Sequence, residues 1–528
     1  MRKLPIGIQS IRKILNKKEH VYVDKTGFIK QLFDEGSPHY FISRPRRFGK
    51  SLFLDTLGEI FKGNKQLFKE CQIYNSDYSW QEHPVLLFDF AQISHSSREE
   101  FINGIKAELK RIGKLHKVEV EGPSIQFQLK VLVEDLAKKN RVVVLVDEYD
   151  SPIINNLKKP EIADQNRDIL KGFFTTLKGL DKHLKFTFVT GVSKFSQVSL
   201  FSGPNHLTDI TMNPKYAGMM GYTEEEVKVC FPDHIDDVVK NREGLSTENI
   251  LSEIRTWYNG YRFSERELSV YNPYSTLRYF VAKKVEGYWY STGTPSFLVD
   301  QVKNHPRSIV PLSGITASKS QLLDISEVTQ IDLAALMFQT GYLTIVDYNS
   351  VTNRYVLGFP NEEVKEAFFE TLIRHFAKID TSLSMECQEA LDAYNLDIFF
   401  KKMQSMIASF PYQLFIKASE STYHGILLGI LKGMGFQVYG EEATNLGRID
   451  IVIEADQVTY LIELKLDSKA EVAIEQIHQK KYYEKYLHKG KEVAIVGVGL
   501  SSKTRNISDW EGTLFLPDGK LKRKILPH

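Results

Sequence analysis

Three unbroken apolar runs limit what this chain can fold into more than any other feature of its sequence. They are VLLFDF at 85–90, VVVLVD at 142–147 and FTFVTG at 186–191. Runs of β-branched and aromatic residues without polar alternation are typical of strands covered on both faces, as in a parallel sheet beneath helices. Helical stretches separate the three runs, so the sequence predicts an α/β domain.

Composition and length exclude several classes of protein. Apolar residues make up 42% of the 528 residues and charged residues 25%, which is ordinary for globular proteins and unlike disordered or collagen-like chains. A chain of this length usually forms about three domains. Lysine and arginine number 68, against 66 aspartate and glutamate residues, so any nucleic-acid surface must be local.

The spacing of the cysteines and the hydropathy of the chain indicate the cellular compartment in which the protein is expected. Cys71, Cys230 and Cys387 lie far apart and in no metal-binding spacing, which argues against a disulfide framework and against a zinc site. The sequence contains no run of about 18 consecutive apolar residues. We therefore expect a cytoplasmic protein without a membrane partner.

The patterns along the chain predict three domains. The α/β domain spans 1–215, and amphipathic helical stretches such as TEEEVKVCF and EEVKEAFFETLIRHFAK dominate 216–415. From 416 to 528 the predicted order is one helix, three strands, a long helix and a further strand. This order indicates a second, compact α/β domain.

A turn rich in basic residues, RPRRFG, separates a predicted strand at 39–43 from a predicted helix at 50–62. At such a junction, backbone amides and the positive end of the helix can bind phosphate. Phe48 and Gly49 complete the turn. Lys50 would reach the β and γ phosphates of ATP, and Ser51 would bind Mg²⁺.

A second motif, VVVLVDEYD, supports this interpretation. Asp147 ends a buried strand and would hold the Mg²⁺ through water, while Glu148 would orient the attacking water. Thr190, or Ser193 with Lys194, would sense the γ phosphate from the neighbouring strand. For these three residues a plain loop role is equally compatible with the sequence.

The loop departs from the usual Walker A pattern at its first position. Arg44 stands where that motif has its first glycine, and Pro45, Arg46 and Arg47 follow. Glycine normally permits the tight wrap around the β phosphate, so the sequence predicts nucleotide binding more firmly than rapid hydrolysis. We expect the three arginines to contact phosphate, or a second anion such as DNA.

Charged residues interrupt the apolar strands of GRIDIVIEADQVTYLIELKLD. Asp450 lies in the first strand, and Glu463 and Lys465 lie two positions apart in the second, so both project from one face. The hairpin brings Asp450 beside them. The two carboxylates would hold Mg²⁺ or Mn²⁺ for in-line attack on a phosphodiester, and the lysine would orient or activate water. The alternative is a charged, exposed hairpin face.

Other residues are weaker candidates. Glu442 and His424 can supply a further ligand or base, although each fits a structural role better. Several basic residues can meet phosphates, although such charges usually lie in solvent. These are Arg448, Lys469, Lys520, Lys522, Arg523 and Lys524.

Together these motifs resemble those of a bacterial family of AAA-ATPase-like proteins with a fused C-terminal PD-(D/E)XK nuclease domain. The resemblance covers nearly the whole chain and rests on PIGIQSIRKI, YVDKT, RPRRFGKS, LVDEYD, GVSKFS, WYNGY, VYNPYS, YWYSTGTPSFL, FQTGYLTI, YHGILLGIL, GRIDIVI, IELKLD and QIHQKKYYEKY. It implies an AAA-like P-loop ATPase domain at 1–215, a helical lid at 216–415 and a restriction-endonuclease-like domain at 416–528. In such proteins an arginine at the first Walker A position is typical.

Two functions are open at this stage. The first is an ATP-regulated, Mg²⁺-dependent nuclease acting on DNA in preference to RNA, with mobile elements or defence against foreign DNA as its setting. The second is a nucleotide-dependent switch or scaffold whose nuclease-like domain binds nucleic acid or a partner without cutting. Nucleotide-driven translocation along DNA would also require a homo-oligomer, which the sequence leaves open.

Overall fold

The computed structural model describes residues 1–195, 207–242, 244–289, 315–323, 332–376, 379, 381–416, 418–444, 447–487 and 490–527. The chain divides into two compact units. The first unit holds the described residues of Met1–Phe297 and Thr316–Glu363, and the second those of Leu298–Ile315 and Val364–His528. The division into three domains drawn from the sequence stays a prediction. In the described part of the chain, no helix has both the length and the apolar character needed to cross a bilayer.

A five-stranded parallel sheet forms the centre of the first unit, with the strand order β2-β3-β4-β1-β5. The predicted α/β fold and its four predicted strands are therefore confirmed. β5 is only two residues long and carries no sequence signal strong enough to predict it. The strands are β1 (His39–Ser43), β2 (Val85–Asp89), β3 (Val142–Asp147), β4 (Leu184–Gly191) and β5 (Thr208–Asp209).

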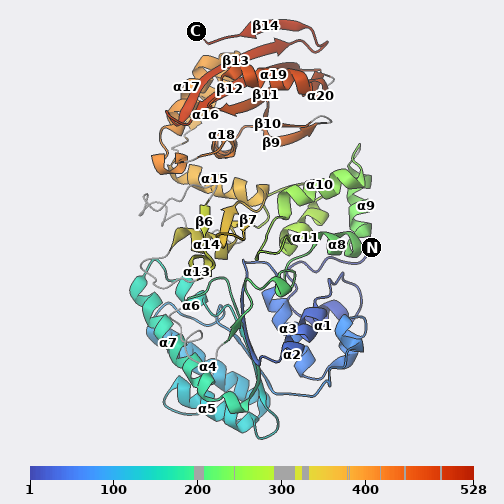
Figure 1. Cartoon of the computed structure of the whole chain (residues 1–528), viewed down its shortest axis with the longest axis vertical. Coiled ribbons are helices and arrows are strands. Elements are labelled where there is room, and N and C mark those ends of the chain that lie inside the picture. The colour runs from blue at the N-terminus through green and yellow to red at the C-terminus, as the bar shows by residue number, and fades with distance from the viewer. Residues whose placement is uncertain are drawn as a thin grey trace. The chain divides into compact units, whose positions relative to one another are not determined.

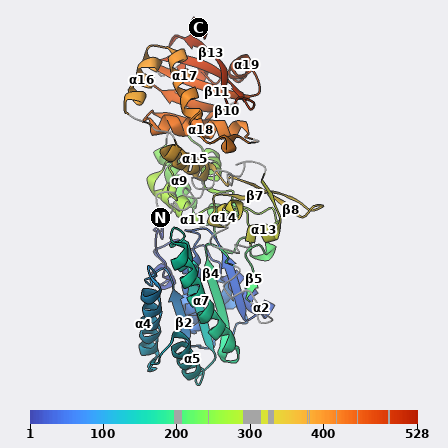
Figure 2. The same cartoon turned by 90° about the vertical axis from the view of Figure 1, so that its left-hand side faces the viewer.

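Helices cover both faces of this sheet, which explains why its strands are apolar throughout. Figures 1 and 2 show α3 with α1 and α2 on one side and α4, α5 and α7 on the other. Phe173 of α7 packs edge-on against Phe88 and Phe90 at the end of β2. The helices are α1 (Ile11–Leu15), α2 (Thr26–Glu35), α3 (Lys50–Phe61), α4 (Arg98–His116), α5 (Ile125–Leu136), α6 (Ser151–Ile154) and α7 (Pro160–Gly179).

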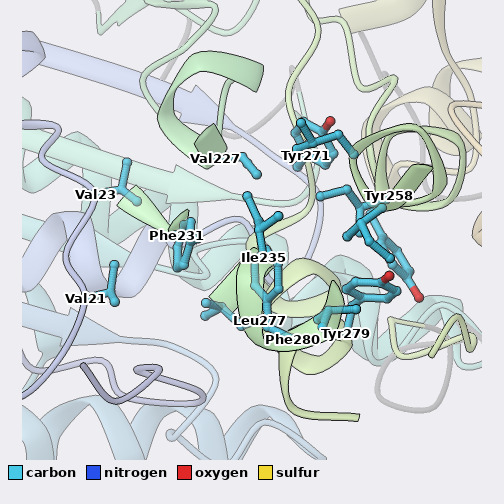
Figure 3. Packing of buried hydrophobic residues seen from close by; sticks show 14 of the residues in the cluster. Val21, Val23, Val227, Phe231, Ile235, Tyr258, Tyr271, Leu277, Tyr279 and Phe280 are labelled. Carbon is cyan, nitrogen blue, oxygen red and sulfur yellow. The ribbon is translucent and has the colours of Figure 1, made fainter. Parts of the chain in front are cut away.

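Four further helices of the first unit share a core with the start of the chain. Val21 and Val23 pack into the same buried cluster as Phe231, Tyr258 and Tyr271 (Figure 3). The early segment and the helical segment are thus one packed structure. The helices are α8 (Glu224–Cys230), α9 (Pro232–Asn241), α10 (Thr247–Tyr258) and α11 (Pro273–Ala282).

The last part of the first unit adds a small sheet to the predicted helices. It is three-stranded, with the order β6-β8-β7, and its hairpin was not predicted from the sequence. The elements are β6 (Ile315–Ala317), α13 (Lys319–Leu323), α14 (Leu333–Thr340), β7 (Thr344–Asn349) and β8 (Arg354–Gly358). The prediction of a mostly helical middle region nevertheless holds.

The second unit is built around a six-stranded sheet with the order β14-β13-β12-β11-β10-β9. β11 and β12 pair in parallel, and α19 connects them, whereas the other pairs are antiparallel. The predicted order of a helix, three strands, a helix and a strand is confirmed by α18 to β12, and β13 and β14 extend it. The elements are α15 (Glu362–Phe376), α16 (Thr381–Asp392), α17 (Leu396–Ile407), α18 (Glu420–Gly433), β9 (Val438–Thr444), β10 (Gly447–Glu454), β11 (Val458–Leu466), α19 (Ala470–Lys480), α20 (Glu484–Leu487), β12 (Glu492–Ser501), β13 (Asn506–Phe515) and β14 (Leu521–Ile525).

Candidate functional site

The basic turn of the first unit connects β1 to α3, as the sequence predicts. Gly49 has a φ of 88°, a left-handed conformation that glycine adopts without strain. No side chain caps the N-terminus of α3. The amides of its first turn therefore point to the loop without a side-chain partner, which is the arrangement that favours a bound anion.

Lys50 and Ser51 follow at the start of α3. The Lys50 ammonium donates to the carbonyl oxygens of Arg44 and Pro45 at 2.9 and 3.0 Å, so it lies across the loop. Burial lowers the pKa of Lys50, an effect that the nearby carboxylates, Glu148 first among them, partly offset. A buried ammonium beside free amides is suited to binding phosphate.

Asp147 collects hydroxyl donors from two other elements. Ser51 Oγ donates to Asp147 Oδ2, and Thr190 Oγ1 donates to Oδ1 at 2.6 Å. The sheet order explains this convergence, because β4 lies between β1 and β3. Ser51, Asp147 and Thr190, which the sequence placed in one site, do come together, and an oxygen-rich group of this kind suits Mg²⁺.

Arg44 lies beneath the loop instead of facing it. Its side chain is 1% exposed, and the guanidinium donates to the carbonyl oxygens of Ser43, Thr211 and Tyr216 at 2.9, 2.8 and 3.4 Å. It also stacks over Phe263, 4.0 Å from the ring centroid, and burial lowers its pKa to about 9. This position argues against the phosphate contact expected from the sequence and points to support of the loop.

Arg46 and Arg47 face the cavity beside the loop. Arg47 is exposed and lies 5.1 Å from the ring centroid of Tyr274. Phe48 is buried, with its ring centroid 4.8 Å from that of Tyr261. Phe48 therefore anchors the loop, while the two arginines remain available to an anion.

A cavity of about 420 Å³ adjoins the loop, within the range of about 300–1,000 Å³ that is usual for small-molecule sites. Its lining includes residues 46–51 and Glu148 together with the apolar side chains of Ile8, Val21 and Leu277. Glu148 has a φ of 46°, a strained conformation for a residue with a side chain. The cavity thus offers both basic and apolar side chains to a bound molecule.

Ser193 and Lys194 do not point to the loop. Ser193 donates from both its backbone N and its Oγ to Asp150 Oδ2, at 2.6 and 2.8 Å. Lys194 Nζ lies 3.0 Å from Asp209 Oδ2. Thr190, near the end of β4, does reach the Asp147 carboxylate.

A second candidate site lies in the second unit, where β10 and β11 pair. Lys465 Nζ lies 3.6 Å from Glu463 Oε1, so the two side chains share one face of β11 as predicted. Asp450 Oδ2 accepts a hydrogen bond from the backbone N of Leu464 at 2.8 Å. This bond brings the Asp450 carboxylate between the other two residues.

Glu463 is the most perturbed group of this site. It is only 2% exposed, and burial together with the charge of Asp450 raises its pKa to about 8. Gln476 of α19 donates to Glu463 Oε1, while Oε2 is buried and has no hydrogen-bond partner. A buried carboxylate oxygen without a donor is costly unless a cation binds it.

These donors fit a divalent cation. No group of three or more His, Cys, Asp or Glu side chains among the described residues is arranged to hold one. A cation held here by the two carboxylates of Asp450 and Glu463 would need water or substrate oxygens to complete its shell, as is usual for Mg²⁺.

Glu420, in the first turn of α18, belongs to the same constellation and was missed from the sequence. Its carboxylate accepts from the backbone N of Leu466 at 2.8 Å and lies 3.5 Å from Lys465 Nζ. The signal that could have revealed it is an acidic residue at the start of the helix that precedes the three strands. His424, one turn further on, bonds the backbone carbonyl of Asp450 at 2.8 Å, which suits a positioning role.

Two of the weaker basic candidates lie beside acidic residues. Lys522 pairs with Glu492, and Lys520 lies 2.9 Å from Asp518. Lys522, Arg523 and Lys524 belong to β14, a strand that was not predicted from the sequence. The side chain of Glu442 lies outside the described residues, so its predicted role stays a prediction.

Comparison with known proteins agrees with this arrangement. Residues 5–201 match the family described as predicted AAA-ATPase, and residues 418–510 match the PD-(D/E)XK nuclease superfamily. Over 523 residues the chain is 38% identical to an uncharacterized protein in the vnfD 5′ region of Azotobacter chroococcum mcd 1, which covers 96% of this chain and 98% of that protein. The chain belongs to the AAA-ATPase-like family with a C-terminal PD-(D/E)XK nuclease domain.

Solved structures resemble this AAA-ATPase-like protein only loosely. The Walker-type ATPase PABY2304 of Pyrococcus abyssi is 12% identical, with a TM-score of 0.36 over 65% of this chain and 95% of that one. The ORC2 protein of Aeropyrum pernix, solved in ADPNP and ADP complexes, is 13% identical, with a TM-score of 0.26 over 64% of this chain and 88% of that one. The fold assignment rests on the sheet order and the family matches, not on these structures.

Proposed function

We propose that this AAA-ATPase-like protein is an ATP-binding nuclease that uses a divalent cation to cut phosphodiester bonds, with DNA favoured over RNA. The observation that carries the proposal is the group formed by the buried Glu463 and the half-buried Asp450 and Lys465, in which Glu463 Oε2 has no hydrogen-bond partner. A polar group buried in this way is rarely retained in a merely structural hairpin.

Each residue has a separate task in the proposed nuclease site. Asp450 and Glu463 would hold Mg²⁺ or Mn²⁺, which when bound would supply Lewis acidity and a more acidic water. Lys465 would donate to the scissile phosphate or to the attacking water and offset the charge that develops there. Gln476 fixes Glu463 Oε1, which leaves Oε2 as the oxygen directed to the cation.

The ATP site would be built on the β1–α3 loop. The amides of the first turn of α3 and Lys50 would bind the phosphates, and Ser51 and Asp147 would hold a Mg²⁺. Glu148, which lines the cavity, would orient the attacking water. Arg46 and Arg47, which also line the cavity, would provide further positive charge, and the exposure of Arg47 would be compatible with a homo-oligomer.

The experiment is a cleavage assay of purified protein on linear, circular and single-stranded DNA and on RNA, with Mg²⁺ or Mn²⁺ and with or without ATP. Asp450→Ala should abolish cutting. Asp456→Ala is the matched control, because Asp456 is an exposed aspartate in the turn of the same hairpin. Cutting that survives Asp450→Ala would refute the assigned site, and a wild type that cuts no substrate would refute the nuclease.

The alternative is a nucleotide-dependent switch whose second unit binds nucleic acid or a partner without cutting. The observation that favours it is Arg44, since a buried arginine stiffens a loop that glycine usually keeps adaptable. A cellular phenotype that is lost in Lys50→Ala and retained in an Asp450→Ala/Lys465→Ala double variant would support the switch.

A further inference from the structure

Two successive residues of the phosphate-binding loop contact segments that are distant in sequence. Gly341 packs so closely on Pro45 that a Cβ at this glycine would come 2.7 Å from Pro45 Cβ. The backbone carbonyl of Arg46 accepts a hydrogen bond from Trp289 Nε1 at 3.2 Å. The loop is therefore in contact with two segments that follow it by more than 200 residues, through the Pro45 side chain and the Arg46 carbonyl.

Trp289 also contacts Glu363, so it joins the loop to this glutamate. Its backbone N donates to Glu363 Oε1 at 2.7 Å, and Ser275 Oγ donates to the same oxygen at 3.0 Å. Glu363 is 1% exposed, and its Oε2 has no hydrogen-bond partner. Few hydrogen-bond donors thus hold this buried side chain in place. The loss or movement of one of them would leave a buried carboxyl oxygen without a partner and would raise the free energy of the folded state.

Glu363 lies in the first turn of α15, and the chain passes from its first compact unit into its second within this helix. The residues just before α15 have little room to adjust. A Cβ at Gly260 would come 1.8 Å from the carbonyl oxygen of Pro360. Because Glu363 belongs to α15, a displacement of its side chain would act directly on the first turn of this helix.

We propose that Trp289 is a positioning residue that couples the nucleotide state of the loop to α15. The inference rests on the proposed ATP site. Lys50 Nζ binds the carbonyl oxygens of Arg44 and Pro45, and a γ phosphate would draw the ammonium away from them. Release of the Arg44 and Pro45 carbonyls then moves the neighbouring Arg46 carbonyl. Trp289 moves with this carbonyl through its indole hydrogen bond, and the backbone N of Trp289 in turn shifts the Glu363 carboxyl group.

The test is hydrogen–deuterium exchange of the α15 amides in the full chain, with and without a slowly hydrolysed ATP analogue and Mg²⁺, beside a direct titration of the analogue. In the wild type, the analogue should change exchange in α15 by about fivefold or more. Trp289→Phe removes the indole donor and keeps a ring against Tyr342, whose centroid lies 5.2 Å away. This variant should bind the analogue as the wild type does, and its α15 should no longer respond.

Three further variants separate coupling from folding. Trp257→Phe is the matched control, because it makes the same substitution at a half-buried tryptophan of α10, and it should respond normally. Glu363→Leu breaks the link at its other end and should behave as Trp289→Phe does. Glu363→Gln keeps an Oε1 acceptor and should restore the response.

Several results would overturn the coupling. The first is a wild-type protein in which bound analogue leaves the exchange of the α15 amides unchanged. The second is a Trp289→Phe protein in which the analogue changes this exchange as it does in the wild type. The third is a Glu363→Gln protein that shows the same loss of response as Glu363→Leu. An analogue that does not bind the wild type in the titration would refute the ATP site itself, and with it the coupling, so the two failures are read from different measurements.

Discussion

Thr190 Oγ1 donates a hydrogen bond of 2.6 Å to Oδ1 of Asp147, and this bond ties the end of β4 to the carboxylate that ends β3. The bond leaves Asp147 Oδ2 to Ser51, so that the carboxylate, the hydroxyl and the start of α3 form one rigid group. The Thr190–Asp147 bond joins two strands that are neighbours in the sheet.

Thr190→Val should slow nucleotide hydrolysis by about tenfold or more, because a bond to a charged group contributes about 1.5–3 kcal/mol. Hydrolysis is measured by phosphate release under saturating ATP. Thr187→Val is the matched control, since Thr187 is buried in the same strand and its hydroxyl has no hydrogen-bond partner. Equal rates for the two variants would contradict the role given to Thr190.

Arg44→Ala should destabilise the first unit by about 2–4 kcal/mol, because it removes the donor of several buried carbonyls and the stack on Phe263. Arg44→Gly, which restores the usual first residue of the motif, should be no better for the same reason. Urea unfolding followed by tryptophan fluorescence measures the effect. Arg47→Ala is the control, since Arg47 is exposed. A stable Arg44→Gly protein that hydrolyses ATP faster would contradict the structural role given to Arg44.

Cleavage at low Mg²⁺ should rise with pH until about pH 8. Burial and Asp450 raise the pKa of Glu463 to about 8, so below that pH the folded site keeps a proton that a cation must displace. Proton and cation compete for one carboxylate, and higher Mg²⁺ should therefore move the midpoint of the profile to lower pH. Initial rates at several Mg²⁺ concentrations give both results. A midpoint that does not move with Mg²⁺ would mean that Glu463 is not a ligand.

The parts of this protein that sequence reasoning predicted well are those where periodicity and burial coincide. β1 and β3 begin and end at the residues expected, and the helix after the basic turn begins at Lys50, because each is an apolar run bounded by polar residues or glycine. Side chains two positions apart in a strand lie on one face, which placed Glu463 beside Lys465, and the short turn of the hairpin placed Asp450 next to them.

The sequence could not show where a side chain points or which residues distant in sequence it contacts. The place of Arg44 under the loop depends on carbonyls at Thr211 and Tyr216, which no local pattern connects to it. Glu420 reaches Lys465 only after α18 has packed in the second unit. The long predicted helix after β11 divides at Lys481, whose φ is 49°, although its sequence favours a continuous helix.

Glu420→Gln should reduce cleavage by about tenfold without unfolding the second unit. Burial alone would lower the pKa of Lys465, but Glu420, Glu463 and Asp450 outweigh it and raise that pKa. The glutamine keeps an oxygen that accepts from the backbone N of Leu466, so the change removes chiefly one negative charge beside the ammonium. Lys465 then turns more strongly to Glu463 and is less free to meet the phosphate.

The measurement is the rate of cleavage at saturating Mg²⁺, with urea unfolding as the check on stability. Glu471→Gln is the matched control, because Glu471 is an exposed acid in the first turn of α19. An unchanged rate in Glu420→Gln would exclude Glu420 from the site. A loss as complete as that of Asp450→Ala, relieved by raising Mg²⁺, would instead make Glu420 a third ligand of the cation, since ligand loss appears as weakened metal binding.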